Sequence, residues 1–153
     1  DFLYIPNNKQ IYPTGPNKKI KITTFSKKLC GKFRPGHFKA VVDVVNRLNN
    51  LIRPKKIFLG KKDFQQIKII EWFFKKNKIN TKIVECKTIR ESSGIPLSSR
   101  NFLLTLNEKK IASLVYKIIY KLKVKIIKKQ ILIKEIKKSQ RRNGGFRKAG
   151  IRA

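Results

Sequence analysis

"KIFLGKKDFQQIKIIEWFF", residues 56–74, decides the fold. Its first five residues form a run that is too short for a helix and is typical of a strand buried on both faces. Gly60 then frees a turn, and Asp63 is a suitable N-cap for the helix that follows. The predicted inward face of that helix is Phe64, Ile67, Ile70, Trp72 and Phe73. Because "TKIVEC" at 81–86 is typical of another strand, the segment predicts a right-handed βαβ unit with parallel strands.

The flanking sequence predicts one more strand and further helices. The elements are a loop over 1–17, a strand with one wet face over 19–25, a helix over 38–52 ended by Pro54, a loop over 87–101, a helix from Thr105 to about Lys129 and a helical segment over 131–139. Alternating polarity indicates the strand, and apolar residues at helical spacing indicate the helices. Thr105 and Glu108 have the spacing of a capping box.

Composition limits the classes of function. The chain has 153 residues and is 41% hydrophobic, which is enough to fill the core of one domain. A net charge of +31 normally indicates nucleic acid or an anionic membrane as the partner. Of the 39 basic residues, however, 30 are Lys and 9 are Arg, and Arg is the bidentate reader of phosphates and guanine. We therefore expect no specific nucleic-acid partner, and keep a basic RNA- or ribosome-binding protein as the alternative.

The sequence has no pattern typical of a membrane span, a signal peptide or a metal site. No run reaches the roughly 18 to 20 apolar residues of a membrane span, and the first residues do not have the pattern of a signal peptide. Cys30 and Cys86 have no metal-ligand spacing, and the carboxylates form no metal-type cluster. We therefore expect a cytoplasmic protein with unpaired thiols, no membrane partner and no metal site.

The first candidate site is the stretch from Gly60 to Gln66. In an open parallel sheet, ligands bind beyond the carboxyl ends of the strands, and this stretch is expected at such an end. Lys62 could neutralise a phosphate, Asp63 could accept hydrogen bonds from ribose hydroxyls, and Gln66 could orient a polar substrate. The alternative is that Asp63 only caps the helix and that Lys62 is one lysine among 30.

Two loops offer the other candidates. Ser98, Ser99 and Arg100 could wrap phosphate oxygens with two hydroxyls and a guanidinium, although this is also ordinary loop composition. His37, within "RPGHF" at 34–38, is the single histidine, and a lone His beside an apolar helix is more often structural than chemical. The residues alone leave these alternatives open.

Three motifs in order carry a resemblance to a known family. "RPGHFKAVVDVVNRLNNLIRP" (34–54), "FLGKKDFQQIKII" (58–70) and "IRESSGIPLSSRN" (89–101) strongly resemble the pantoate-beta-alanine ligases, or pantothenate synthetases. The resemblance covers about residues 10–125. It implies a Rossmann-like α/β nucleotidylyltransferase fold of the HIGH superfamily, a parallel sheet with flanking helices, present in part.

The resemblance also implies a domain organisation and an activity. Residues 1–100 would be the C-terminal part of the ATP- and pantoate-binding domain, and 101–153 the truncated start of a smaller C-terminal domain. Pantoate and ATP, the latter with Mg²⁺, would give pantoyl adenylate and pyrophosphate, after which β-alanine would attack the acyl carbon to give pantothenate and AMP. A homodimer is implied as well, and another enzyme of the same superfamily is the nearer alternative.

Matching positions carry the family's residue roles onto this chain. The ATP site falls on Gly60, Lys62, Asp63, Ile89, Leu97, Ser98, Ser99 and Arg100, and the pantoate site on Gln66, His37, Arg34, Val44 and Val45. The implied catalytic residues are Lys62, on the phosphates, and the phosphate-gripping Ser98, Ser99 and Arg100. Gly60 and Asp63 would hold the ribose, and Ile89 and Leu97 would contact adenine.

The chain departs from the family pattern in several places. Lys61 stands where the family usually has Glu, and Pro96 where it usually has Ala. The family's Pro-Thr-Met-Gly segment and His-x-Gly-His pair are not in the sequence, which also holds no Met. We therefore expect an internal fragment that is inactive alone.

Overall fold

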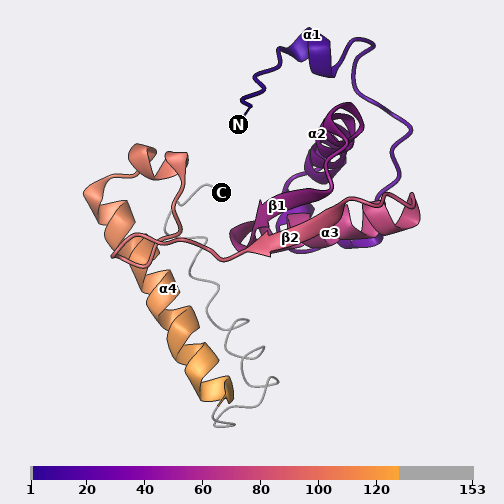
Figure 1. Ribbon diagram of the computed structural model, residues 1–153. Coiled ribbons are helices and arrows are strands. Elements are labelled where there is room, and N and C mark those ends of the chain that lie inside the picture. Colours follow the sequence, from indigo (N-terminus) through magenta and orange to yellow (C-terminus); the bar gives the residue numbers. More distant parts are fainter. Residues whose placement is uncertain (1, 128–153) are drawn as a thin grey trace. The chain divides into compact units, whose positions relative to one another are not determined.

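The computed structural model describes residues 2–127 (Figure 1). Contacts divide the chain into two compact units, of which the first is Asp1–Thr88 and the second begins at Ile89. Each unit is described by itself. Whether the predicted domain division after residue 100 matches the family's domains stays a prediction. No helix within the described part of the chain is long and apolar enough to cross a membrane.

The centre of the first unit is the predicted βαβ unit. Strand β1 (Lys56–Gly60) and strand β2 (Lys82–Cys86) pair in parallel, and helix α3 (Phe64–Lys76) connects them (Figure 1). In this register Ile57 lies opposite Ile83, and Leu59 lies opposite Glu85. The predicted parallel α/β arrangement is therefore confirmed.

Helix α2 (His37–Ile52) packs with α3 to form the core of this unit. Its bounds confirm the predicted helix, which ends two residues before Pro54. The buried cluster consists of Ile20, Phe38, Val42, Ile69, Ile70, Phe73 and Phe74. Apolar residues of both strands pack against that cluster, so one face of the sheet is covered.

Two predictions about burial are wrong. The side chains of β1 alternate between exposed and half-buried, and Phe58 is 66% exposed, because helices of the described chain cover a single face of the sheet. Phe64 is 53% exposed rather than inward. The buried stripe of α3 begins at Gln65 and continues through Ile69 and Phe73. Phe64 directly precedes Gln65, and adjacent residues of a helix point in directions about 100° apart, so Phe64 lies outside that stripe.

The predicted strand over 19–25 is also wrong. This segment makes no strand pairing, and it ends in a 3-10 helix, Thr24–Lys27, capped by the Thr23 hydroxyl, which accepts a hydrogen bond from the Phe25 N–H at 3.3 Å. Ile20 is nonetheless buried and Ile22 is half-buried. Alternating polarity thus indicated only that one side of the segment is buried, and a segment that pairs with no strand can also bury one side. A second 3-10 helix, Leu29–Phe33, follows.

An ion pair fastens the N-terminal segment to α2. Asp43 is only 3% exposed, and its carboxylate accepts hydrogen bonds from Arg47 Nε at 2.7 Å and from the Asn17 N–H at 2.8 Å. The Arg47 guanidinium also donates to the carbonyls of Ile11 at 2.9 Å and Gly15 at 2.8 Å. These bonds hold helix α1 (Asn8–Ile11), which interrupts the predicted N-terminal loop.

The second unit consists of a tight loop and a long helix. Arg90 and Pro96 form an isolated antiparallel bridge, and Gly94 has φ +89° beneath the ring of Tyr116. A 3-10 helix, Ser99–Leu103, leads into helix α4 (Leu106–Ile127). The predicted end at Lys129 and the helical segment over 131–139 lie outside the described residues.

The predicted capping box at the start of α4 is confirmed. The Thr105 N–H and hydroxyl donate to Glu108 Oε2, both at 2.8 Å, and the Glu108 N–H donates to the Thr105 hydroxyl at 3.3 Å. These bonds satisfy backbone N–H groups that lack a partner inside the helix.

Candidate functional site at the carboxyl edge of the sheet

The carboxyl end of β1 leads into α3 through a single turn of 3-10 helix, Lys61–Asp63. Lys62 and Asp63 are exposed there. Asp63 occupies the N-cap position of α3, but its side chain makes no capping hydrogen bond, so its predicted role as a cap is wrong. Its carboxylate is therefore not committed to the helix end and can accept hydrogen bonds from a ligand.

The backbone conformation at Gly60 does not require a glycine. Its backbone is extended, with φ −72° and ψ 129°, and a Cβ built on it would have nothing within 4 Å. The prediction that Gly60 is needed to free the turn is therefore wrong. A glycine that the described fold does not require, at the carboxyl end of a parallel strand, leaves room for a ligand to approach the backbone.

The two adjacent glutamines have different environments. Gln65 is 6% exposed, and its Nε2 donates to the carbonyls of Phe25 at 3.0 Å and Lys28 at 2.7 Å. Its Oε1 accepts from Cys30 Sγ at 2.7 Å. Gln66, the candidate for substrate binding, is half-buried in the first turn of α3. Gln65 is thus a structural residue that sequence reasoning missed.

A network of ion pairs lies at the same edge. Lys61 Nζ is 3.2 Å from Glu85 Oε2, and Lys68 Nζ is 2.8 Å from Glu85 Oε1 and 2.9 Å from Glu71 Oε2. The hydrogen bond from Lys68, followed by that from Lys61, lowers the pKa of Glu85 below its ordinary value. The bonds to Glu85 and then Glu71 raise the pKa of Lys68. Both shifts favour the charged forms of Glu85 and Lys68.

The start of α2 carries two of the predicted pantoate residues. His37 is the first residue of the helix, half-buried, with its ring centroid 5.1 Å from that of Phe38. Arg34 is exposed and lines a cavity of about 550 Å³ together with Lys27, Lys32 and Lys39. This cavity therefore offers a cationic wall beside the start of α2.

Val44 and Val45, the predicted apolar wall of the pantoate site, are both half-buried on α2. Val45 packs against the core cluster of the first unit. Its structural role is therefore accounted for by the described chain, whereas contact with a substrate stays a prediction for both residues.

In the second unit the remaining predicted residues lie along one loop. Ile89 and Leu97, both exposed, are brought together by a hydrogen bond from the Leu97 N–H to the Ile89 carbonyl at 3.0 Å. The Ser98 hydroxyl accepts from the Arg100 N–H at 3.2 Å and caps the 3-10 helix, while Ser99 and Arg100 are exposed. Asn101 steadies this loop by donating to Glu91 Oε1 at 2.6 Å and the Pro96 carbonyl at 3.0 Å.

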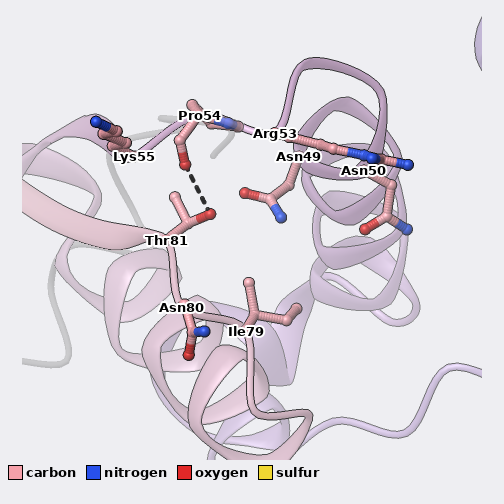
Figure 2. A pocket seen from close by; sticks show the side chains of 8 residues that line it. All are labelled: Asn49, Asn50, Arg53, Pro54, Lys55, Ile79, Asn80 and Thr81. Atoms are coloured by element: carbon pink, nitrogen blue, oxygen red, sulfur yellow. Dashed lines mark hydrogen bonds between the residues drawn. The ribbon is translucent and has the colours of Figure 1, made fainter.

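A pocket of about 460 Å³ lies at the opposite edge of the sheet, where α2 ends and the two strands begin (Figure 2). Figure 2 shows the Asn49 side chain reaching from α2 toward Thr81, whose hydroxyl donates to the Pro54 carbonyl at 2.9 Å. Asn49 Oδ1 is buried and has no hydrogen-bond partner. None of the predicted site residues lines this pocket.

A parallel βαβ unit packed against a further helix is the arrangement of a Rossmann-like α/β protein. The family model "Pantoate-beta-alanine ligase" matches residues 1–149. The chain belongs to the pantoate-beta-alanine ligase family, and its predicted membership is confirmed.

Individual relatives agree with this assignment. The pantothenate synthetase of Coprothermobacter proteolyticus is 38% identical over 135 residues, which cover 86% of this chain and 47% of that protein. The bifunctional pantoate ligase/cytidylate kinase of Prochlorococcus marinus is 47% identical over 115 residues, 72% of this chain and 22% of that protein. The chain spans about half the length of the curated pantothenate synthetases it matches.

Solved structures confirm the predicted nucleotidylyltransferase fold. The pantoate-beta-alanine ligase of Francisella tularensis, solved as a complex with beta-gamma ATP and beta-alanine, is 42% identical with a TM-score of 0.67. The match covers 73% of this chain and 43% of that protein. The pantothenate synthetase of Thermus thermophilus is 32% identical with a TM-score of 0.69, over 73% of this chain and 41% of that protein.

Proposed function

We propose that this chain forms part of an ATP-dependent ligase that condenses pantoate with β-alanine through a pantoyl adenylate. The observation that carries the proposal is the Lys61–Asp63 turn at the carboxyl edge of β1, in a chain of the ligase family. The Francisella relative bound to beta-gamma ATP and beta-alanine supports ATP and β-alanine as substrates. Pantoate follows from the family's name.

In this proposal the first unit holds the ribose and part of the phosphate chain. Lys62 binds ATP phosphates, and Asp63 accepts hydrogen bonds from ribose hydroxyls while the backbone of Gly60 approaches the sugar. The uncommitted Asp63 carboxylate and the open space at Gly60 support these roles. Gln66, His37, Arg34, Val44 and Val45 bind pantoate, with Arg34 supplying positive charge for its carboxylate.

The loop of the second unit holds the other parts of ATP. Ile89 and Leu97 present exposed apolar side chains to adenine, and the hydrogen bond that joins their backbones supports a shared role. Ser98, Ser99 and Arg100 grip the phosphates with two hydroxyls and a guanidinium. These three residues and Lys62 are the proposed catalytic residues.

The chemistry explains why cations are needed. Adenylation moves negative charge onto the β- and γ-phosphates as they leave, so fixed positive groups stabilise the transition state more than the ground state. Among the described residues no group of three His, Cys, Asp or Glu side chains could hold a metal ion. Mg²⁺ is therefore proposed to enter on the phosphates of ATP, as part of the substrate.

The test is pyrophosphate release by a chimaera in which this chain replaces the matching segment of the Francisella ligase, and by the chain alone. We expect release by the chimaera that depends on both ATP and pantoate, followed by AMP and pantothenate once β-alanine is added. A folded chimaera that releases no pyrophosphate would contradict the proposal. A homodimer and a cytoplasmic location are further parts of this proposal, and sedimentation of the chimaera tests the first.

A further inference from the structure

Glu85 joins two lysines beside the candidate nucleotide turn, and none of the roles proposed above uses it. In the strand register Glu85 lies opposite Leu59, one residue before the end of β1. One carboxylate oxygen pairs with Lys61 of the turn and the other with Lys68 of α3, at 3.2 and 2.8 Å. The carboxylate therefore ties the end of β2 to both segments that follow β1.

Lys61, which Glu85 holds, directly precedes Lys62, the residue proposed to bind the phosphates. A lysine ammonium is a compact charge on a flexible stem, so it attracts a polyanion without fixing its orientation. The Lys61 side chain is 53% exposed and would be able to reach a bound phosphate chain if it were released. Two adjacent ammonium groups would then compete for the same phosphates.

We propose that Glu85 is a positioning residue that withholds Lys61 from the phosphate chain, so that phosphates bind in the register set by Lys62. The proposal rests on the function proposed above. Lys68, which also pairs with Glu71 at 2.9 Å, stays bound if Glu85 is removed, whereas Glu85 is the one ion-pair partner recorded for Lys61 among the described residues. Loss of the Glu85 charge thus releases mainly one cation, Lys61.

The test is a double-mutant cycle on the 153-residue chain, with inorganic pyrophosphate as the probe and calorimetry as the readout. Glu85→Gln should tighten pyrophosphate binding about threefold to tenfold, the range expected for one added charge a few ångströms away in water. Lys61→Gln should not tighten binding and should weaken it by no more than the same factor, because it removes a cation that Glu85 already holds but leaves the Glu85 carboxylate in place. The double variant should return to the wild-type affinity.

Glu71→Gln is the matched control. It changes the net charge by the same amount within the same network but leaves the Lys61–Glu85 pair intact. Its affinity for pyrophosphate should stay within about twofold of wild type. The gain from Glu85→Gln should also shrink with added salt, because the Debye length falls from about 10 Å at 0.1 M to about 3 Å at 1 M.

The outcomes separate the two proposals. A purely structural role for Glu85 would weaken binding or leave it unchanged, so either result with a binding wild-type chain overturns this inference and leaves the proposed function standing. Failure of every variant to bind pyrophosphate overturns this inference, whereas pyrophosphate release by the chimaera decides the proposed function separately. If Glu85→Gln lowers the folded fraction, Glu85→Asp keeps the charge and shortens the reach, and an intermediate gain in affinity is then expected.

Discussion

Three polar side chains of the described chain are more than nine-tenths buried: Asp43, Asn49 and Gln65. Asp43 and Gln65 each connect a helix to backbone that is distant in sequence. Buried polar groups are stabilising when every donor and acceptor is satisfied, and removal of one partner leaves the other desolvated. These two residues therefore hold the loops around α2 and α3 in place.

Replacement of Asp43 tests this role. Asp43→Asn should lower the free energy of unfolding by about 1 to 3 kcal/mol, less than for a fully buried pair because the Arg47 side chain is partly exposed. Denaturant unfolding measures the change. Asp63→Asn is the control, since the Asp63 side chain makes no cap hydrogen bond, and it should alter stability by less than about 0.5 kcal/mol. Equal effects at both positions would contradict the assignment.

At the proposed site, Lys62→Ala should lower the rate of pyrophosphate release by the chimaera roughly 100- to 1000-fold, the usual cost of losing one preorganised charge stabiliser. The physical reason is that Lys62 would meet charge that develops on the leaving phosphates. Single-turnover assays at saturating ATP and pantoate measure the change. A near-normal rate would remove Lys62 from the mechanism, and Lys61→Ala serves as the neighbouring control, for which only a small change is expected.

At the scale of elements, the start of α4 depends on a charge. Hydrogen bonds from the Thr105 N–H and then from its hydroxyl lower the pKa of Glu108 below its ordinary value of 4.5. A carboxylate whose pKa is lowered in the folded state contributes stability above its unfolded pKa, and this is lost as the pH falls through the folded value. The box should therefore support α4 at neutral pH and weaken in acid.

Glu108→Gln isolates this effect because the amide still accepts hydrogen bonds. We expect the variant to be less stable than wild type near neutral pH, and we expect the difference to disappear once the pH is well below the folded pKa of Glu108. Thermal unfolding followed by far-ultraviolet circular dichroism measures both. If the variant and wild type differ in stability by the same amount at both pH values, the difference does not come from the Glu108 charge.

For the whole molecule, the +31 charge is expected to be incidental to function. Binding to nucleic acid should then be weak at physiological salt, strongly salt-dependent and indifferent to sequence, because it would arise from counterion release alone. Fluorescence anisotropy with RNA and DNA of several sequences measures this. A sequence-selective complex with nanomolar affinity would favour the alternative of an RNA-binding protein.

Local patterns in the sequence determined the main elements of this protein. The parallel βαβ unit, the bounds of α2 and the capping box of α4 were all predictable, because helical period, strand length and cap chemistry depend on residues within a few positions of one another. The same holds for the family, whose three motifs are contiguous stretches. The turn that carries Lys62 was likewise placed correctly at the end of β1.

Only the tertiary structure decided how these elements meet. The buried side chain of Gln65, unlike that of Gln66, is satisfied by carbonyls 40 and 37 residues away in the sequence. The buried carboxylate of Asp43 likewise accepts a hydrogen bond from a backbone N–H 26 residues away. The segment over 19–25 has a strand's alternation but no strand pairs with it. Periodicity records which side of a segment is apolar, whereas pairing and satisfaction of buried polar groups depend on which distant atoms the fold brings within hydrogen-bonding distance.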